Sequence, residues 1–260
     1  MKLALVDGQR RGALPKLVGE CIYCGSAMIA KCGDVYAHHW AHKSRQECDP
    51  WWENETEWHR GWKNQFPLSW QEVVHRAQDG EKHIADVQTE DDWFIEFQHS
   101  RIRPEERVAR EAFYGKLVWV VDGRLRPTYE ESFHKALGAA VAPIRQLPSL
   151  GRFRQLKGHL LEQWAGRKVH VLLDFGGASP LWWLLPLRGI QGRWIMPMCR
   201  ADFIQAIGPV KLRGDKDFGV AADRYIGMLK EFELMEQQAN NARSRAIEPL
   251  AIPRTRHRRR

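Results

Sequence analysis

The sequence predicts an α/β fold, with an α+β mixed sheet behind a small zinc-binding lobe. Three observations lead to this prediction. Residues 50–122 run in the order helix, three strands, helix and strand, which suits a mixed sheet with helices on its faces. A segment rich in cysteine and histidine precedes them. The chain has 260 residues, enough for one large domain or two small ones with a sizeable core.

The first predicted unit is a zinc-binding lobe over residues 1–48. It opens with a short hairpin around Asp7-Gly8 and continues as a loop broken by Gly12, Pro15 and Gly19. Three cysteines and three histidines then follow within 22 residues. A lobe of this size lacks the core to hold itself together, so a structural metal ion is expected.

The Cys21-Ile-Tyr-Cys24 knuckle places two thiolates on one tight turn, where they can share a tetrahedral zinc ion. Two downstream histidines complete the preferred ligand set, which is Cys21, Cys24, His39 and His42. The spacing of the two histidines is tighter than in DNA-reading zinc fingers. The rivals for a ligand position are Cys48, which is the strongest, and also Cys32 and His38.

A helix is predicted to begin at Asp49-Pro50, because aspartate is a good N-cap and proline suits the first helical position. It runs to Lys63 and opens the second unit, a core over residues 49–124. Glu55, His59 and Lys63 fall at i, i+4 and i+8 and therefore share one face. That face either aims its side chains at a common site or is a solvated face held by ion pairs.

The hairpin over residues 83–100 is the central element of this core. It reads as two strands joined by a polar turn at residues 89–92. Each strand carries an acid at an interior position, Asp86 and Glu96, and Gln98 shares the face of Glu96. Buried acids tend to be paired or to bind a metal ion. The pattern therefore indicates a divalent-cation site, and its alternative is an edge hairpin with one wet face.

The remaining elements of the core flank this hairpin. A strand is predicted over residues 69–76 before it. After it, a helix begins at Pro104 and ends at Gly115, and a buried strand covers residues 116–121. Arg110 and Tyr114 lie one turn apart on that helix.

Residues 125–241 are predicted to form a C-terminal accessory α+β region. A linker over residues 142–151 divides it. Helices are expected over residues 128–140, 152–166, 201–207 and 217–242, and strands near 169–174, 181–185 and 194–197. The tryptophans of this region favour a docking surface for a protein partner.

The net charge of +8 is concentrated in a basic, disordered tail over residues 242–260. This tail carries seven arginines and one glutamate, a net of +6, so the rest of the chain carries only +2 (8 − 6). Such a tail is typical of contacts with nucleic-acid phosphates. Its alternative role is that of a solubilising end.

The sequence favours a cytoplasmic protein with no membrane partner. No apolar run approaches the length of a membrane span, and the apolar N-terminal stretch is too short for a signal peptide. The five cysteines form an odd set, which favours free or metal-bound thiols over disulfides.

Taken together, these motifs resemble the competence-protein CoiA-like nucleases within the PD-(D/E)XK superfamily. The resemblance spans residues 20–122 and implies a metal-dependent nuclease core behind a zinc-binding lobe. It rests on the Cys-x2-Cys knuckle with His39-Trp-Ala-His42, Glu55-Thr-x-x-His59-x-x-x-Lys63, His-Ile-Ala-Asp86, Ile-Glu96-Phe-Gln98-x-Ser100 and Arg110-x-x-x-Tyr114.

The resemblance implies that Asp86 and Glu96 are the metal-binding carboxylates. The superfamily tends to carry an acid or a histidine on the first helix, aimed at the same metal ion, and Glu55 and His59 match those positions. His59 would then bind the metal or relay a proton.

Gln98 departs from the superfamily, which usually has lysine at this position. An amide can orient a water molecule, but it supplies no positive charge to the scissile phosphate. Either Lys63 or Lys82 would compensate for the missing charge, or the activity would be lower. Arg110 and Tyr114 resemble the helix pair that lines the site in related nucleases, where they would contact the substrate.

The expected function is that of a metal-dependent deoxyribonuclease, which hydrolyses DNA phosphodiester bonds at a Mg²⁺ or Mn²⁺ site on Asp86 and Glu96. Zinc in the lobe would be structural. The alternative is a catalytically weak or inactive nucleic-acid-binding or assembly module on a nuclease scaffold, regulated by a protein partner.

Overall fold

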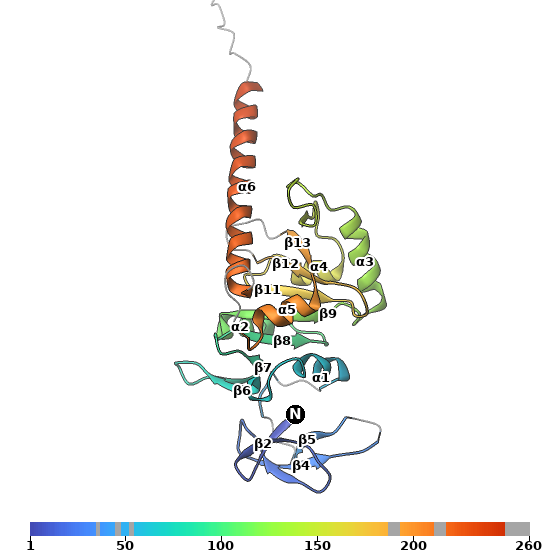
Figure 1. The fold of residues 1–260 in the computed structure, drawn as a ribbon, viewed down its shortest axis with the longest axis vertical. Helices are drawn as coiled ribbons and strands as arrows, with labels where there is room; N and C mark the ends of the chain where they lie inside the picture. The colour runs from blue at the N-terminus through green and yellow to red at the C-terminus, as the bar shows by residue number, and fades with distance from the viewer. Residues whose placement is uncertain (35–36, 45–47, 52–54, 187–192, 211–216, 248–260) are drawn as a thin grey trace, which may run out of the picture.

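The computed structural model describes residues 1–34, 37–44, 48–51, 55–186, 193–210 and 217–247. Within them the chain forms a five-stranded antiparallel sheet and an eight-stranded mixed sheet. The two sheets lie one beyond the other, with the N-terminal sheet at one end of the molecule (Figure 1). This confirms the predicted mixed α/β class.

The five-stranded sheet is the N-terminal lobe, and its strand order is β2-β1-β3-β4-β5. Its strands are β1 (Leu3–Val6), β2 (Gln9–Gly12), β3 (Val18–Glu20), β4 (Ala27–Lys31) and β5 (His39–His42). The hairpin around Asp7-Gly8 is confirmed. The segment expected as a loop contains β3, because Gly19 permits close pairing: a Cβ there would lie 2.7 Å from the carbonyl oxygen of Leu5.

The eight-stranded sheet has the order β10-β13-β12-β11-β9-β8-β7-β6. Its strands β8, β9 and β11 are parallel neighbours, and all other neighbouring pairs are antiparallel. The strands are β6 (Gln71–Arg76), β7 (Lys82–Gln88), β8 (Phe94–Gln98), β9 (Leu117–Asp122), β10 (Gly151–Arg152), β11 (His170–Asp174), β12 (Leu181–Leu184) and β13 (Trp194–Met198).

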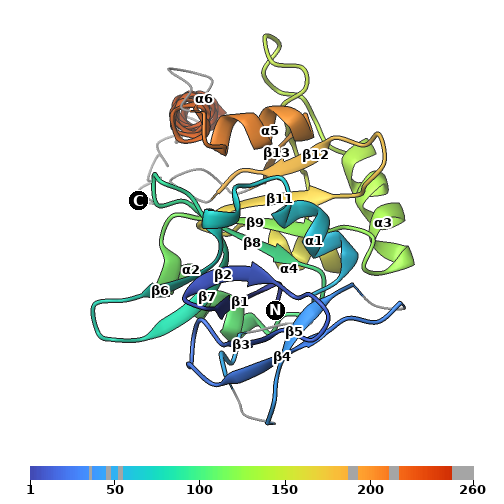
Figure 2. The ribbon, with the colours of Figure 1, turned by 60° about the horizontal axis from the view of Figure 1, so that its bottom comes forward.

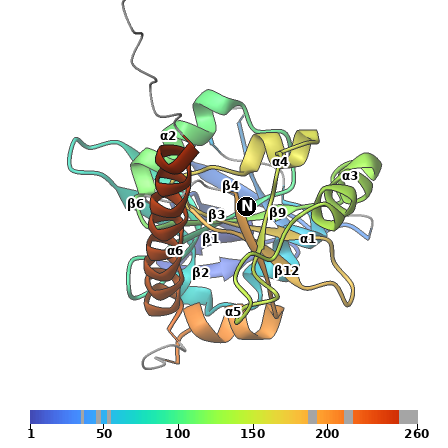
Figure 3. The same cartoon turned by 90° about the horizontal axis from the view of Figure 1, so that it is seen from above.

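Helices cover both faces of this sheet and bury a separate apolar core on each. One face packs against α1 (Glu57–Lys63), α5 (Arg200–Ile207) and α6 (Phe218–Ile247). The other packs against α2 (Pro104–Tyr114), α3 (Pro127–Gly138) and α4 (His159–Trp164). Figure 3 shows α2 and α4 on the opposite side of the molecule from α5. No helix among the described residues is long and apolar enough to cross a membrane.

The order α1, β6, β7, β8, α2, β9 agrees with the order predicted for residues 50–122. The second half of the chain then continues the same sheet, since β11 pairs with β9 in parallel at Leu172 and Val120. The predicted boundary after residue 124 therefore falls between two neighbouring strands of one sheet (Figure 2).

Two predicted helices are shorter than expected. The helix expected from Asp49 to Lys63 begins at Glu57, and Thr56 is its N-cap; residues 52–54 lie outside the described residues. Asp49 instead accepts hydrogen bonds from β7. Of the helix expected over residues 152–166 only α4 forms, because the chain before it pairs with β13.

Asp174, at the end of β11, joins the two halves of the chain. Its carboxylate accepts hydrogen bonds from the indole N–H groups of Trp58 (3.0 Å) and Trp62 (2.9 Å) on α1. It also pairs with both terminal nitrogens of Arg200 on α5, at 3.0 and 2.5 Å. Burial alone would raise the pKa of Asp174, but Arg200 and the backbone N–H of Gly176 lower it.

We expect Asp174→Ala to lower the free energy of unfolding by about 3 kcal/mol, because it leaves Arg200 and two indole groups without their acceptor. Urea denaturation at pH 7 measures this, with Asp34→Ala on the lobe surface as the matched control. The lowered pKa means that the wild-type advantage exists above about pH 4 and shrinks as the carboxylate becomes protonated. An equal effect of both substitutions would contradict this role.

Candidate functional site

The candidate site lies where β7 and β8 separate. The two strands pair only next to their turn, through Val87 with Ile95 and Gln88 with Phe94. Beyond these pairs, hydrogen bonds to the side chains of Asp86 and Glu96 take the place of backbone hydrogen bonds between the two strands. Glu96 Oε1 accepts a hydrogen bond from the backbone N–H of Asp86 (3.2 Å), and Asp86 Oδ2 accepts one from that of Phe97 (3.0 Å).

A cavity of about 40 Å³ occupies this opening, room for a metal ion or a water molecule. The ionisable side chains that line it are four carboxylates, two cations and one imidazole. They are Glu55, Glu72, Asp86, Glu96, Lys63, Arg110 and His59. The structure thus brings the predicted residues of the first helix together with the two acids of the hairpin.

Lys63 is the cation at the centre of the carboxylates. Its Nζ lies 2.9 Å from Glu55, 3.2 Å from Glu72 and 3.4 Å from Asp86. Burial alone would lower the pKa of Lys63, but the three carboxylates outweigh burial and raise it. Burial likewise acts to raise the pKa of Glu55, and Lys63 and Arg60 reverse this and lower it to about 2.

Glu96 is paired with the second cation. Its Oε2 lies 3.0 Å from Arg110, which also contacts Glu106 (2.5 Å) and donates to the carbonyl oxygen of Trp51 (2.6 Å). Burial and the neighbouring Asp86 raise the pKa of Glu96 to about 8, against the opposing effect of Arg110. A carboxyl group with such a pKa binds either a proton or a cation near neutral pH.

His59 is buried and held by two hydrogen bonds. Its Nε2–H donates to the carbonyl oxygen of Phe97, so Nδ1 of the neutral ring accepts from the Thr56 hydroxyl (3.1 Å). The imidazole thereby fixes α1 against the backbone of β8, directly beside Asp86 and Glu96.

Two of the predicted site residues do not line the cavity. Gln98 is buried, and its amide donates to the carbonyl oxygen and hydroxyl of Ser100 at 3.3 and 3.1 Å. Tyr114 is buried in an aromatic cluster, with its ring 4.7 Å from that of Phe94. The predicted substrate-binding pair on α2 is thus divided between Arg110 at the cavity and Tyr114 in the core.

Sequence reasoning missed Glu72. This residue of β6 stands between Gln71 and Val73, which pair with Val87 and Ala85 of β7, so it lies opposite Asp86. Its φ of +49° is costly for a side chain other than glycine. The conformation lets its carboxylate reach Lys63 and the cavity. The sequence did hold one signal for Glu72, namely that it is an acid in the strand predicted next to the one that carries Asp86.

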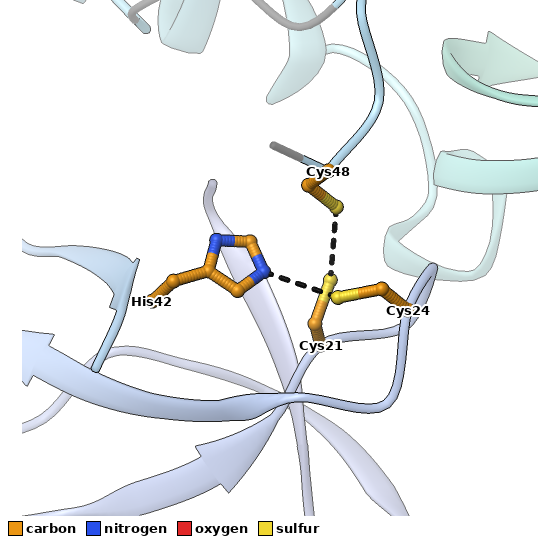
Figure 4. A group of neighbouring side chains, drawn as sticks. All are labelled: Cys21, Cys24, His42 and Cys48. Carbon is orange, nitrogen blue, oxygen red and sulfur yellow. Dashed lines mark hydrogen bonds between the residues drawn. The ribbon is translucent and has the colours of Figure 1, made fainter. Parts of the chain in front are cut away.

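A second cluster lies in the N-terminal lobe and consists of Cys21, Cys24, His42 and Cys48 (Figure 4). All four ligand atoms lie within 4.8 Å of one another. The Sγ atoms of Cys21 and Cys48 are 3.6 Å apart, and Cys24 Sγ lies 3.3 Å from His42 Nε2. Zinc–ligand bonds of 2.0–2.3 Å place tetrahedral ligands about 3.5–3.8 Å apart, so the cluster could hold a zinc ion.

The fourth position of this cluster belongs to Cys48 and not to His39, the preferred candidate from the sequence. His39 and His42 are three residues apart on β5, and such residues face opposite sides of a strand. His39 Nδ1 instead lies 3.0 Å from the carbonyl oxygen of Ala37. Cys32 and His38, the other substitutes, are also outside the cluster.

The thiol groups differ in their readiness to ionise. Burial acts to raise the pKa of Cys24, but hydrogen bonds to Ser26, His42 and Cys21 lower it to about 6. Burial raises the pKa of Cys21. A zinc ion would favour the thiolate form of each.

Comparison with known proteins identifies no relative: no protein-family model matches this sequence, and no curated protein or solved structure matches it.

We expect Cys48→Ser to lower the zinc content of the purified protein, whereas His39→Ala keeps one zinc ion per chain. The reason is that Cys48 supplies one of four ligand atoms and His39 supplies none. Metal analysis by mass spectrometry, with thermal unfolding beside it, measures both. Zinc loss in His39→Ala with full retention in Cys48→Ser would contradict the assignment.

Proposed function

We propose that this protein is a metal-dependent deoxyribonuclease, with Asp86 and Glu96 as the ligands of a Mg²⁺ or Mn²⁺ ion. The observation that carries the proposal is the meeting of these two carboxylates in one cavity, beside Glu55, Glu72 and His59. Carboxylate oxygens are the ligands that magnesium and manganese prefer. Lys63 and Arg110 also line the cavity, and Glu55 is paired with Arg60 at 2.6 Å, so a divalent cation would bind chiefly through Asp86 and Glu96.

The order of the elements supports the same proposal. The resemblance to the PD-(D/E)XK nucleases implies the order helix, three strands, helix and strand, and α1 to β9 follow that order. The acids sit where β7 and β8 separate, and both of them line the cavity in this opening.

The divalent cation would lower the pKa of a bound water molecule and neutralise charge on the scissile phosphate. The protein's own residues prepare this site. The backbone N–H of Phe97 orients the Asp86 carboxylate, and the backbone N–H of Asp86 orients that of Glu96, so little reorganisation is needed to bind a cation. His59 holds α1 in place, and Arg110 restrains Glu96.

Lys63 is proposed to supply the positive charge that Gln98 lacks. Its ammonium group lies 3.4 Å from Asp86, inside the cavity. Lys82, the other candidate, is committed elsewhere: its Nζ donates to the carbonyl oxygen of Tyr23 at 2.7 Å. With a cation on Asp86, Lys63 would exchange its contact with Asp86 for one with a phosphate oxygen, while it remains paired with Glu55 and Glu72.

Purified protein should nick or degrade DNA in the presence of Mg²⁺ or Mn²⁺, and Asp86→Ala and Glu96→Ala should abolish cleavage. Gel assays on linear, circular, single-stranded and double-stranded DNA with each metal test this. Wild type as inert as Asp86→Ala on every form of DNA and with every metal would refute the proposal.

We expect Lys63→Gln to lower the cleavage rate by about 10²–10³-fold, the usual loss when one charge-stabilising group is removed. Gln98→Ala should cost much less, because the Gln98 amide bonds to Ser100 and not to the cavity. Single-turnover cleavage rates give the comparison, and circular dichroism verifies that both variants fold. The reverse ranking would assign the catalytic role to Gln98.

A specific observation favours the second candidate, a catalytically silent nucleic-acid-binding module. Asp86 is paired with Lys63, and Glu96 with Arg110, so the site is already neutralised in part by its own cations. The arginines of residues 242–260 would provide DNA binding in either case. Salt-sensitive DNA binding that survives Asp86→Ala, with cleavage by neither form, would identify this second function.

A further inference from the structure

We infer that the Cys21/Cys24/His42/Cys48 cluster is a clamp that positions β7, and with it Asp86, for divalent-cation binding in the cavity. The inference rests on the proposed function for the role of Asp86, but the clamp itself rests on contacts of the lobe. Both chain segments that carry cysteine ligands make hydrogen bonds to the start of β7.

The first contact comes from the knuckle itself. Tyr23 stands between Cys21 and Cys24, and its hydroxyl donates to the carbonyl oxygen of Lys82 at 3.0 Å. Lys82 returns a hydrogen bond from Nζ to the carbonyl oxygen of Tyr23 at 2.7 Å, and its Nζ lies 4.3 Å from the centre of the Tyr23 ring. Three contacts therefore join one pair of ligands to the first residue of β7.

The second contact comes from the residue after Cys48. The carboxylate of Asp49, 6% exposed as a residue, lies 2.8 Å from Nδ1 of His83 and accepts the backbone N–H of Ile84 at 2.6 Å. The His83 ring is stacked on Trp51, with centroids 3.3 Å apart. Because Asp49 is bonded to two consecutive residues of β7, the position of Cys48 and the position of this strand are linked.

These two contacts are made to the part of β7 that is not paired with β8. Lys82, His83 and Ile84 pair with β6, but pairing with β8 begins only at Val87. Asp86 lies in this interval, two residues after Ile84, which itself lines the cavity. A shift of the clamp is therefore transmitted to the Asp86 carboxylate.

The segment after Cys48 also reaches the other acid. Trp51 lines the cavity, and its carbonyl oxygen accepts a hydrogen bond from Arg110 at 2.6 Å. Arg110 is the partner of Glu96. A zinc ion would tie Cys48 to the knuckle and to β5, and so would hold Trp51 and Arg110 in place. Among the described residues, the direct side-chain hydrogen bond between Cys48 and the knuckle is a weak one between two thiols, with Sγ of Cys21 and Cys48 3.6 Å apart.

Hydrogen–deuterium exchange of the full chain tests the clamp directly. On removal of zinc with a chelator, the amides of residues 82–86 should exchange at least tenfold faster, while those of β9 and β11 stay protected. Asp49→Asn is the second test: it keeps all four metal ligands, but its amide offers one acceptor oxygen in place of two. We expect normal zinc content and faster exchange of Ile84 and Asp86 in this variant, with Asp34→Asn as the control.

Mn²⁺ affinity, measured by electron paramagnetic resonance, separates the clamp from the proposed function. Zinc-depleted protein and Asp49→Asn should bind Mn²⁺ 10–100-fold more weakly than wild type, the usual effect of a supporting group behind metal ligands. Unchanged exchange of residues 82–86 in both would overturn the clamp. Wild type that binds no Mn²⁺, with exchange as expected, would refute the proposed cation site and leave the clamp standing.

Discussion

β7 and β8 separate inside the sheet, and this separation determines which charged side chains gather beside them. Two strands that part inside a sheet leave backbone N–H groups without partners, and such groups are costly when buried. Here the side chains of Asp86 and Glu96 accept two of them. Glu96 is then buried and Asp86 partly buried, and both are paired with cations, which α1 supplies as Lys63 and α2 as Arg110. The grouping of these acids and cations thus follows from the separation of β7 and β8.

The same constraint explains why the N-terminal lobe sits where it does. Glu72 leaves regular strand geometry to reach Lys63, and its carboxylate also accepts the backbone N–H groups of Lys2 (2.8 Å) and Leu3 (2.8 Å). Asp49 and Tyr23 bind the beginning of β7. The lobe therefore contacts β6 and the start of β7, and its Cys3His cluster lies beside the part of β7 that is not paired with β8.

Local patterns in the sequence were enough to predict most elements. Alternation in residues 83–100, the proline at the start of α2 and the continuous apolar run of β9 each depend on local sequence, and the elements that they predict are confirmed. Glu55, His59 and Lys63, which were predicted to share one helix face, all line the cavity, although Glu55 precedes the helix. Glu55 lies just before the N-cap Thr56, and its carboxylate still reaches Lys63 at 2.9 Å.

What the sequence could not reveal depends on tertiary contacts. The choice of Cys48 over His39 follows from β5 being a strand, which places residues three apart on opposite faces. The cap of α1 is Thr56, whereas Asp49, the cap predicted from the sequence, binds His83 and Ile84 of β7 as well as the backbone N–H of Trp51. The role of Asp174 depends on indole groups more than 100 residues earlier in the chain, whose position no local pattern encodes.

A crystal soaked in Mn²⁺ would show whether Asp86 and Glu96 share a divalent cation, as we propose. We expect an anomalous difference peak in the cavity within about 2.2 Å of an oxygen of each carboxylate, with the Lys63 ammonium displaced from Asp86. A cavity with no such peak at saturating Mn²⁺, and with the ion pair of Lys63 and Asp86 intact, would contradict it.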